Sequence, residues 1–223
     1  MEEGKLSKKD IKIVIAAHKP YRMPEDAMYV PLHVGAEGKK NPDGTPLDLG
    51  YQKDNEGDNI SAKNPYYCEL TGIYYAWKNI PAEYLGLVHY RRYFKGKNKS
   101  KDPFACIVTE PEMEKIFETH RIVVPKKRKY YIETLYSHYA HTHYAEHLDC
   151  VREIIGEQCP DYLNSYDKVI KQTSGYMFNM MVMERALFDS YCAWLFAILF
   201  VITVPSQSWK VTVSLLASGS SLL

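Results

Sequence analysis

Apolar runs of strand type alternate with segments of helical pattern along most of the chain. Residues 11–17 (IKIVIAA) are mostly β-branched and precede a polar turn at 18–20, which predicts a central strand. Leu85, Leu87 and Val88 predict a second buried strand that ends at His89. Further strands are expected at 121–124, which the pattern predicts to be buried, and at 176–183.

Helical signals lie between these strands. Asn64 and Pro65 fit the N-cap and first turn of a helix that runs to about residue 79. Thr109 and Glu112 have capping-box spacing and open a helix to about residue 119. Other helices are expected at 132–157 with a break near residue 142, at 161–171, and from residue 185. Residues 35–58, rich in Gly, Asn, Asp, Pro and Lys, predict a long loop of the kind that is usually functional.

Strands and helices in this order predict one α/β domain. We expect a Rossmann-like unit with a mixed, mostly parallel sheet and helices on both faces. The domain is expected to span residues 11–200, after a polar leader at 1–10. Residues 201–223 change to a composition rich in Val, Ser, Leu and Thr, which predicts an atypical tail, either truncated or altered.

Composition narrows the cellular setting and the class of partner. The 223 residues include 28 Lys plus Arg and 27 Asp plus Glu, so general affinity for nucleic acid is not expected. Five cysteines without a CxxC pair indicate free thiols in a reducing compartment. The polar N-terminus lacks the core of a secretory signal, so a cytoplasmic location is expected. The apolar run 192–204 is shorter than the roughly 18 to 20 residues that cross a bilayer, which favours a buried helix.

The strand that ends at His89 is followed at once by Arg91 and Arg92. Ligands of open α/β sheets bind beyond the carboxyl ends of strands, so these cations suggest an anion pocket. A guanidinium offers two parallel donors to phosphate oxygens and stays charged at any working pH, which favours phosphate as the anion. The alternative is that both arginines form surface ion pairs.

Five longer segments add a family resemblance. They are IVIAAHK (13–19), GDNISAKNPYYCELTGIYYAWKN (57–79), YLGLVHYRRYF (84–94), VPKKRKYYIETLYSHYAHTHY (124–144) and YMFNMMVM (176–183). In this order they resemble a family of GT-A-like glycosyltransferases, formerly a domain of unknown function, that occurs in capsular and exopolysaccharide loci. The resemblance implies a GT-A-like domain that transfers a hexose from a nucleotide sugar, with UDP expected, to a growing and often lipid-linked oligosaccharide. Some members are similar to galactofuranosyltransferases.

The resemblance also assigns candidate donor-binding residues. Sugar transfer from a nucleotide diphosphate requires neutralisation of the leaving group, and many GT-A enzymes use a metal held by Asp-x-Asp. This sequence has no Asp-x-Asp, so metal-independent transfer without a cofactor is expected, while a metal on scattered carboxylates such as Asp58 or Asp149 is the alternative. The donor-binding candidates are His18, Lys19, Asp58, Asn59, Ser61, Lys63, Asn64, Arg91 and Arg92.

Residues 138–149 hold the candidates for acceptor binding and for the base. The i, i+4 spacing of His143 and His147 would suit a metal on a helix, but no further ligand stands at fixed spacing. Within the matched segment an acceptor cleft is favoured. Its candidates are His138, His141, His143 and Tyr144. The catalytic candidates are Asp149, Glu146 and His89, with a solvated helical face as the alternative for Glu146.

These observations predict a cytoplasmic glycosyltransferase of surface-polysaccharide assembly. Lysines alternate at 95, 97, 99 and 101, so peripheral contact with anionic lipid is expected there. The alternative is an inactive nucleotide-sugar-binding module, because family members continue past residue 200 with a polar segment that this sequence replaces. A third interpretation, RNA binding through the 95–101 and 126–129 clusters, is disfavoured by the near-neutral charge.

Overall fold

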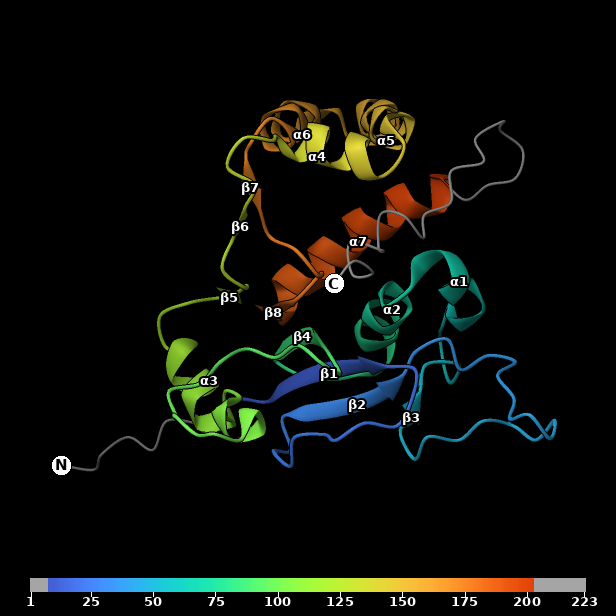
Figure 1. Ribbon diagram of the computed structural model, residues 1–223, viewed down its shortest axis with the longest axis vertical. Coiled ribbons are helices and arrows are strands. Elements are labelled where there is room, and N and C mark those ends of the chain that lie inside the picture. The colour runs from blue at the N-terminus through green and yellow to red at the C-terminus, as the bar shows by residue number, and fades with distance from the viewer. Residues whose placement is uncertain (1–7, 203–223) are drawn as a thin grey trace.

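The computed structural model of the chain describes residues 8–202 and shows a central sheet with helices on both faces (Figure 1). Helix α3, Glu110–Ile116, covers one face, and its Met113 is fully buried there. Helices α2, Leu70–Asn79, and α7, Arg185–Ile202, cover the opposite face. The predicted α/β architecture with helices on both faces is confirmed.

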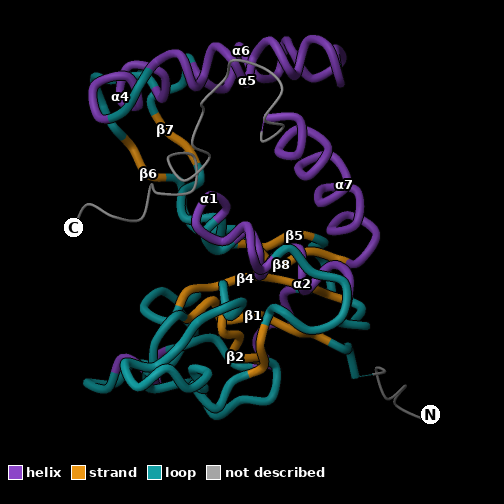
Figure 2. The backbone as a smooth tube through the Cα atoms, turned by 90° about the vertical axis from the view of Figure 1, so that its right-hand side faces the viewer, coloured by secondary structure: helices purple, strands orange, loops and turns teal. Residues whose placement is uncertain are grey.

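A second helical layer lies beyond α7. It consists of α4 (Leu135–Thr142), α5 (Ala145–Gln158) and α6 (Leu163–Ile170). Helix α5 contacts α7, and the predicted break near residue 142 separates α4 from α5. A two-stranded ribbon of β6, Arg128–Lys129, and β7, Ser174–Gly175, runs between this layer and the sheet (Figure 2).

The six strands of the main sheet lie in the order β3-β2-β1-β4-β8-β5. Strands β3, β2, β1 and β4 are parallel, β8 runs antiparallel to β4, and β5 runs antiparallel to β8. The sheet is therefore mixed and mostly parallel, as predicted. Their bounds are β1 Ile11–Ala17, β2 Tyr29–His33, β3 Gln52–Lys53, β4 Tyr84–His89, β5 Ile122–Val123 and β8 Met181–Glu184.

The register of β1 and β4 brings their carboxyl ends together. Ile11 pairs with Tyr84 at one end and Ala16 pairs with His89 at the other. The Tyr90 N–H extends the ladder by donating to the Ala16 carbonyl at 3.2 Å. Because parallel strands end at the same edge, His18 after β1 and the basic residues after β4 become neighbours.

Both faces of β1 are buried, which is why its sequence is a continuous apolar run. Val14 and Ala16 pack with α2 and α7, while Ile13 and Ile15 pack with α3 on the other side. The sheet therefore has two apolar layers, and these hold the strand ends in fixed positions.

The helix predicted over 64–79 is broken in two. Helix α1, Asn64–Tyr67, ends at Cys68, whose φ of 47° is rare for a residue with a side chain, and α2 begins at Leu70. The carbonyl of Cys68 leaves the helical path and accepts from the Asn64 side-chain amide at 2.7 Å. No Gly or Pro marks the break in the sequence.

The strands differ from prediction in three places. The sequence pattern missed β2 and β3, because Pro31 interrupts the short β2 run and β3 has two residues inside the predicted 35–58 loop. The prediction that 121–124 is buried is wrong, since β5 is an edge strand and Ile122 is 44% exposed. Regular pairing within 176–183 starts only at Met181, after two left-handed residues, Phe178 and Asn179.

Helix α7 is, among the described residues, the one helix whose length and composition would allow it to cross a membrane. A third of it (33%) is buried inside the protein, including Phe188, Cys192 and Phe196. It joins the sheet to the second helical layer through its contacts with β4 and α5, and the buried helix predicted from residue 192 is only partly buried over 192–202. Residues 201–202 of the predicted tail still belong to α7, whereas residues 203–223 and the first seven residues of the polar leader lie outside the described residues.

Candidate active site

A cavity of about 260 Å³ opens where the carboxyl ends of β1 and β4 meet α1 and α2. It lies on the face of the sheet that α2 covers. Its lining residues are Ala16, His18, Val34, Asn64, Cys68, Glu69, His89, Tyr90, Arg91 and Arg92. Five of the predicted site residues are therefore brought together here: His18, Asn64, His89, Arg91 and Arg92.

A tight turn after β4 aims the two arginines at this cavity. The Arg92 N–H donates to the His89 carbonyl at 2.9 Å, and the His89 N–H donates to the Arg92 carbonyl at 3.2 Å. The Arg92 guanidinium lies 4.3 Å from the centre of the Phe178 ring. Neither arginine belongs to an ion pair among the described residues, so both guanidinium groups are available to bind an anionic ligand.

The buried ring of Tyr90 gathers cationic groups at the rim. His18 contacts it edge-on at 5.2 Å, and its face attracts the Arg91 guanidinium at 5.0 Å and the Lys19 ammonium at 5.7 Å. Burial, together with Lys19, Arg91 and Lys39, lowers the pKa of His18. The neutral imidazole therefore lies in a positive electrostatic potential, which a bound anion would reduce.

Two consecutive left-handed residues position the other side of the cavity. The Phe178 carbonyl oxygen lies 2.5 Å from His89 Nε2, which must carry the hydrogen because a carbonyl only accepts. The Asn179 side-chain amide donates to Glu69 Oε1 at 2.9 Å. Glu69 is only 6% exposed, and its Oε2 has no hydrogen-bond partner among residues 8–202. A carboxylate oxygen is thus free to accept a hydroxyl inside a mainly cationic cavity.

Asn64 fixes the break between α1 and α2. Besides the Cys68 carbonyl, its amide reaches Thr71 Oγ1 at 3.2 Å. A Cβ on Gly35, whose φ is 68°, would come within 2.3 Å of Asn64 Oδ1, so this close approach requires glycine. The half-buried Cys68 thiol faces the cavity, but burial raises its pKa to about 11, which makes it a poor nucleophile.

Asp54, a fully buried carboxylate that sequence reasoning missed, supports the cavity from behind. It accepts from the backbone N–H groups of Gly35 at 2.8 Å and Ala36 at 3.0 Å. It also accepts from the hydroxyls of Ser61 and Thr71. Ser61, a predicted donor-binding residue, is therefore buried and engaged in holding this loop.

The remaining predicted donor residues do not line the cavity. Asp58 accepts from the Tyr74 hydroxyl at 3.1 Å, and Asn59 bonds to the Gly57 carbonyl at 3.0 Å. Lys63 is exposed, and Lys19 lies beside Tyr90 at the rim. Of these four residues, Lys19 alone contacts a residue of the lining, and the other three lie outside the cavity wall.

The predicted acceptor residues lie in the second helical layer. His138 and His141 both contact Glu133, with Nδ1 to carboxylate distances of 2.7 and 2.6 Å. His143 stacks on Tyr139, and Tyr144 is exposed. The structure thus separates this histidine group from the cavity.

The two carboxylates predicted as bases are also on that layer. Glu146 and Asp149 are both exposed on α5, and Asp149 accepts from the Tyr136 hydroxyl at 3.1 Å. Of the predicted catalytic residues, His89 alone lines the cavity.

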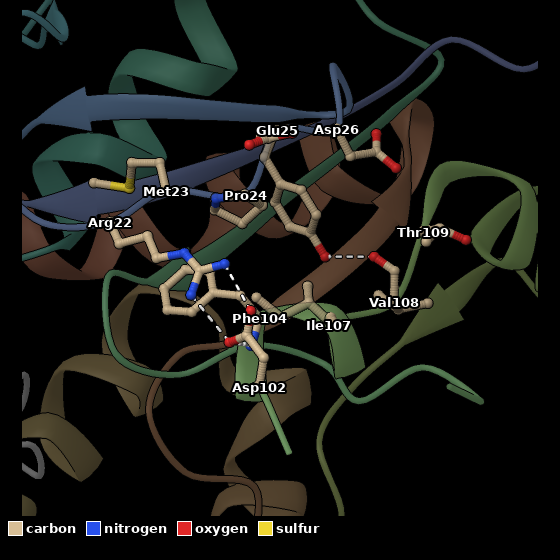
Figure 3. A pocket seen from close by; sticks show the side chains of 12 residues that line it. Arg22, Met23, Pro24, Glu25, Asp26, Asp102, Phe104, Ile107, Val108 and Thr109 are labelled. Carbon is tan, nitrogen blue, oxygen red and sulfur yellow. Dashed lines mark hydrogen bonds and ion pairs between the residues drawn. The ribbon is translucent and has the colours of Figure 1, made fainter. Parts of the chain in front are cut away.

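A second cavity, of about 280 Å³, lies on the opposite face of the sheet (Figure 3). Figure 3 shows Arg22 and Asp102 pointing toward each other across it, with guanidinium to carboxylate distances of 3.0 and 2.7 Å. The guanidinium also lies over the Phe104 ring at 4.4 Å. Because this arginine already has a carboxylate partner, the second cavity is a weaker anion site than the first.

The cavity at the strand ends does not suit a divalent metal. Glu69 is the one carboxylate in its lining, and it stands beside Arg91 and Arg92, whose positive charge opposes a cation. No group of three His, Cys, Asp or Glu residues in the described part of the chain is arranged to hold a metal ion.

Comparisons with known proteins agree with this architecture. The family model described as "Domain of unknown function (DUF4422)" matches residues 12–210. The apo structure of WbbM, a bifunctional glycosyltransferase, superimposes with a TM-score of 0.78 at 28% sequence identity over 93% of this chain. The chain spans 40% of the length of that WbbM chain. No curated protein matches the sequence. The chain therefore belongs to the DUF4422 family and is a single α/β domain of the GT-A-like glycosyltransferase class.

Proposed function

We propose that this domain transfers a sugar from a nucleotide diphosphate donor, with UDP as the expected nucleotide, to a growing surface polysaccharide. The observation that carries the proposal is the cavity at the ends of β1 and β4, where Arg91, Arg92 and His18 converge without carboxylate partners for the arginines. The similarity to a bifunctional glycosyltransferase supports the reaction class.

Each cavity residue has a distinct part in this proposal. The arginines bind the diphosphate and stabilise the negative charge that grows on it as the bond to the sugar breaks. His18, neutral in the free protein, gains a proton beside the bound anion. Glu69 Oε2 accepts a hydrogen bond from a hydroxyl of the donor sugar, while Asn179 holds Oε1.

The base and the acceptor are proposed on the basis of the family resemblance. Of the candidates, His89 stands in the cavity with Nε2 bonded to Phe178, which leaves Nδ1 to receive the acceptor proton. Glu146 and Asp149 would act only if the acceptor or the helical layer brought them to the cavity. We propose a hexose, galactofuranose included, as the transferred sugar and a lipid-linked oligosaccharide at the cytoplasmic side as the acceptor.

A turnover assay tests the proposal. Release of UDP from a panel of UDP-sugars is measured with and without a lipid-linked oligosaccharide acceptor, and acceptor-dependent release with one donor is expected. Binding of UDP-sugars without any turnover would instead support the inactive nucleotide-sugar-binding module. A chain whose residues after 200 are replaced by the polar segment of an active family member is the positive control.

A further inference from the structure

The ribbon between the sheet and the second helical layer carries an unpaired basic surface. Lys126, Lys127, Arg128 and Lys129 are consecutive and all exposed, and β6 within them pairs with β7 (Figures 1 and 2). None of them belongs to an ion pair among residues 8–202. Lys127 and Arg128 instead lie over the rings of Tyr176 and Tyr130.

Two apolar side chains project directly after these cations. Tyr131 is 82% exposed and Ile132 is 94% exposed, more than any other large apolar residue of the described chain. Tyr131 has a φ of 61°, and the Ile132 N–H donates to the Tyr130 carbonyl at 2.7 Å, which forms a strained three-residue turn.

The strained turn is held from both sides. The Tyr130 N–H donates to the Thr173 carbonyl and the Leu135 N–H donates to the Gln172 carbonyl, both at 2.8 Å. The turn therefore cannot relax by folding Tyr131 and Ile132 inward without losing these bonds. We call residues 126–132 the basic ribbon.

We propose that the basic ribbon is a docking surface for an anionic lipid bilayer. Four cations match the charge of the headgroups, and an aromatic and an aliphatic side chain beside them suit the boundary between headgroups and acyl chains. A nucleic acid would satisfy the charges but would leave Ile132 exposed to water. Glu133, the adjacent carboxylate, is turned toward His138 and His141 and so does not oppose the surface.

The basic ribbon combines cations with exposed apolar side chains, which the 95–101 loop lacks. Lys95, Lys97, Lys99 and Lys101 are also exposed, but no large exposed apolar side chain accompanies them. The loop offers screened charge alone, whereas the basic ribbon adds an apolar anchor. The expected membrane contact therefore lies on the basic ribbon rather than on the 95–101 loop.

Flotation with vesicles tests this without nucleotide or acceptor, so its result is independent of sugar transfer. The vesicles contain phosphatidylcholine alone or equal parts of phosphatidylcholine and phosphatidylglycerol. One variant replaces Lys126, Lys127, Arg128 and Lys129 by Gln, and the matched control replaces Lys95, Lys97, Lys99 and Lys101 by Gln. A third carries Tyr131→Asn and Ile132→Ser, in which Asn tolerates the left-handed φ.

We expect binding to anionic vesicles only, at moderate salt. The ribbon charge variant should lose about tenfold or more in partitioning and the loop control less than about threefold, since each cation at an anionic surface contributes about fivefold. The Tyr131→Asn, Ile132→Ser variant should partition more weakly than the wild type although it keeps all four charges, and unchanged partitioning would show that the apolar pair is no anchor. Equal losses in both charge variants, no binding to anionic vesicles, or selective salt-sensitive binding to single-stranded RNA would each overturn the proposal. Binding that survives all variants and requires detergent for release would assign the contact to α7 and overturn it as well.

Discussion

The imidazole of His89, which lines the cavity, and the carbonyl of Phe178 are joined at 2.5 Å, although 89 positions separate them in the sequence. This contact ties the end of β4 to the chain that enters β8. It also fixes the tautomer of neutral His89, with hydrogen on Nε2 and a lone pair on Nδ1. The same turn places the Phe178 ring under Arg92 and the Asn179 amide on Glu69, so two adjacent residues position three cavity side chains.

Replacing Arg91 or Arg92 by Ala should weaken UDP binding. Each variant is expected to lose about 1.5 to 3 kcal/mol, the value of a lost charge-assisted hydrogen bond to phosphate. Titration calorimetry on the folded variants measures this. Arg22→Ala is the matched control, because Arg22 also lies over an aromatic ring but is paired with Asp102 on the other face of the sheet. Unchanged UDP affinity in both variants would remove the arginines from the donor site.

Replacing Glu69 by Gln should separate sugar recognition from diphosphate binding. UDP affinity is expected to stay the same or rise slightly, because a negative charge near the diphosphate is lost. The affinity for the productive UDP-sugar should fall by about 10- to 100-fold, the scale of a lost hydrogen bond to a charged group. Parallel calorimetric titrations with UDP and UDP-sugar make this comparison.

Asn179→Gly provides the companion variant for Glu69. Glycine keeps the left-handed backbone at this position and removes only the amide that orients Glu69. We expect this variant to lose UDP-sugar affinity as well, but by less than Glu69→Gln. If Glu69→Gln lowered the affinities for UDP and for UDP-sugar equally, the carboxylate would support the cavity without contacting the sugar.

Five cavity residues could be predicted from the sequence because they follow the ends of two parallel strands or open the next helix. His18, His89, Arg91 and Arg92 needed only the rule that parallel strands end at one edge. Glu69 and Asn179 could not be predicted in this way, because their contact spans 110 positions and depends on left-handed backbone at non-glycine residues. The break at Cys68 could not be predicted either, because Asn64, whose amide bonds across the break to Cys68 and Thr71, is packed against Gly35, which is distant in the sequence.

Binding of a UDP-sugar should be coupled to proton uptake by His18. In the free protein, burial and nearby cations lower the pKa of His18 below 6.5, and a bound diphosphate raises it again. A pKa that rises on binding means that affinity increases as the pH falls through the range between the two values. Calorimetry in buffers of different ionisation enthalpy should show uptake of up to about one proton.

An intact UDP-sugar is the right ligand for that measurement, because UDP itself has a phosphate ionisation near neutral pH. His18→Asn should abolish the proton uptake that accompanies binding, while the pH-independent part of the UDP-sugar affinity remains. The same proton uptake in wild type and His18→Asn would assign the effect to another group.

Sugar transfer should survive EDTA and gain little from manganese. The reason is the composition of the cavity wall, which offers two arginines and one carboxylate where a metal site would need several oxygen ligands. The measurement is the initial rate of UDP release before and after chelation. Complete loss in EDTA with recovery in manganese would show that a metal, rather than the arginines, neutralises the leaving group.

The Asp54 carboxylate has one more consequence, which concerns how the family can diversify. It accepts from the backbone N–H groups of Gly35 and Ala36 at the start of the long loop, and Asp54 itself lies near the end of that loop. The two ends of the loop are therefore held together by one side chain. Residues 38–50, which lie between these two ends and before β3, can therefore change in length and composition while the ends stay in place. In evolution or by grafting, the loop between these ends can be exchanged for another loop while the sheet and the cavity are preserved.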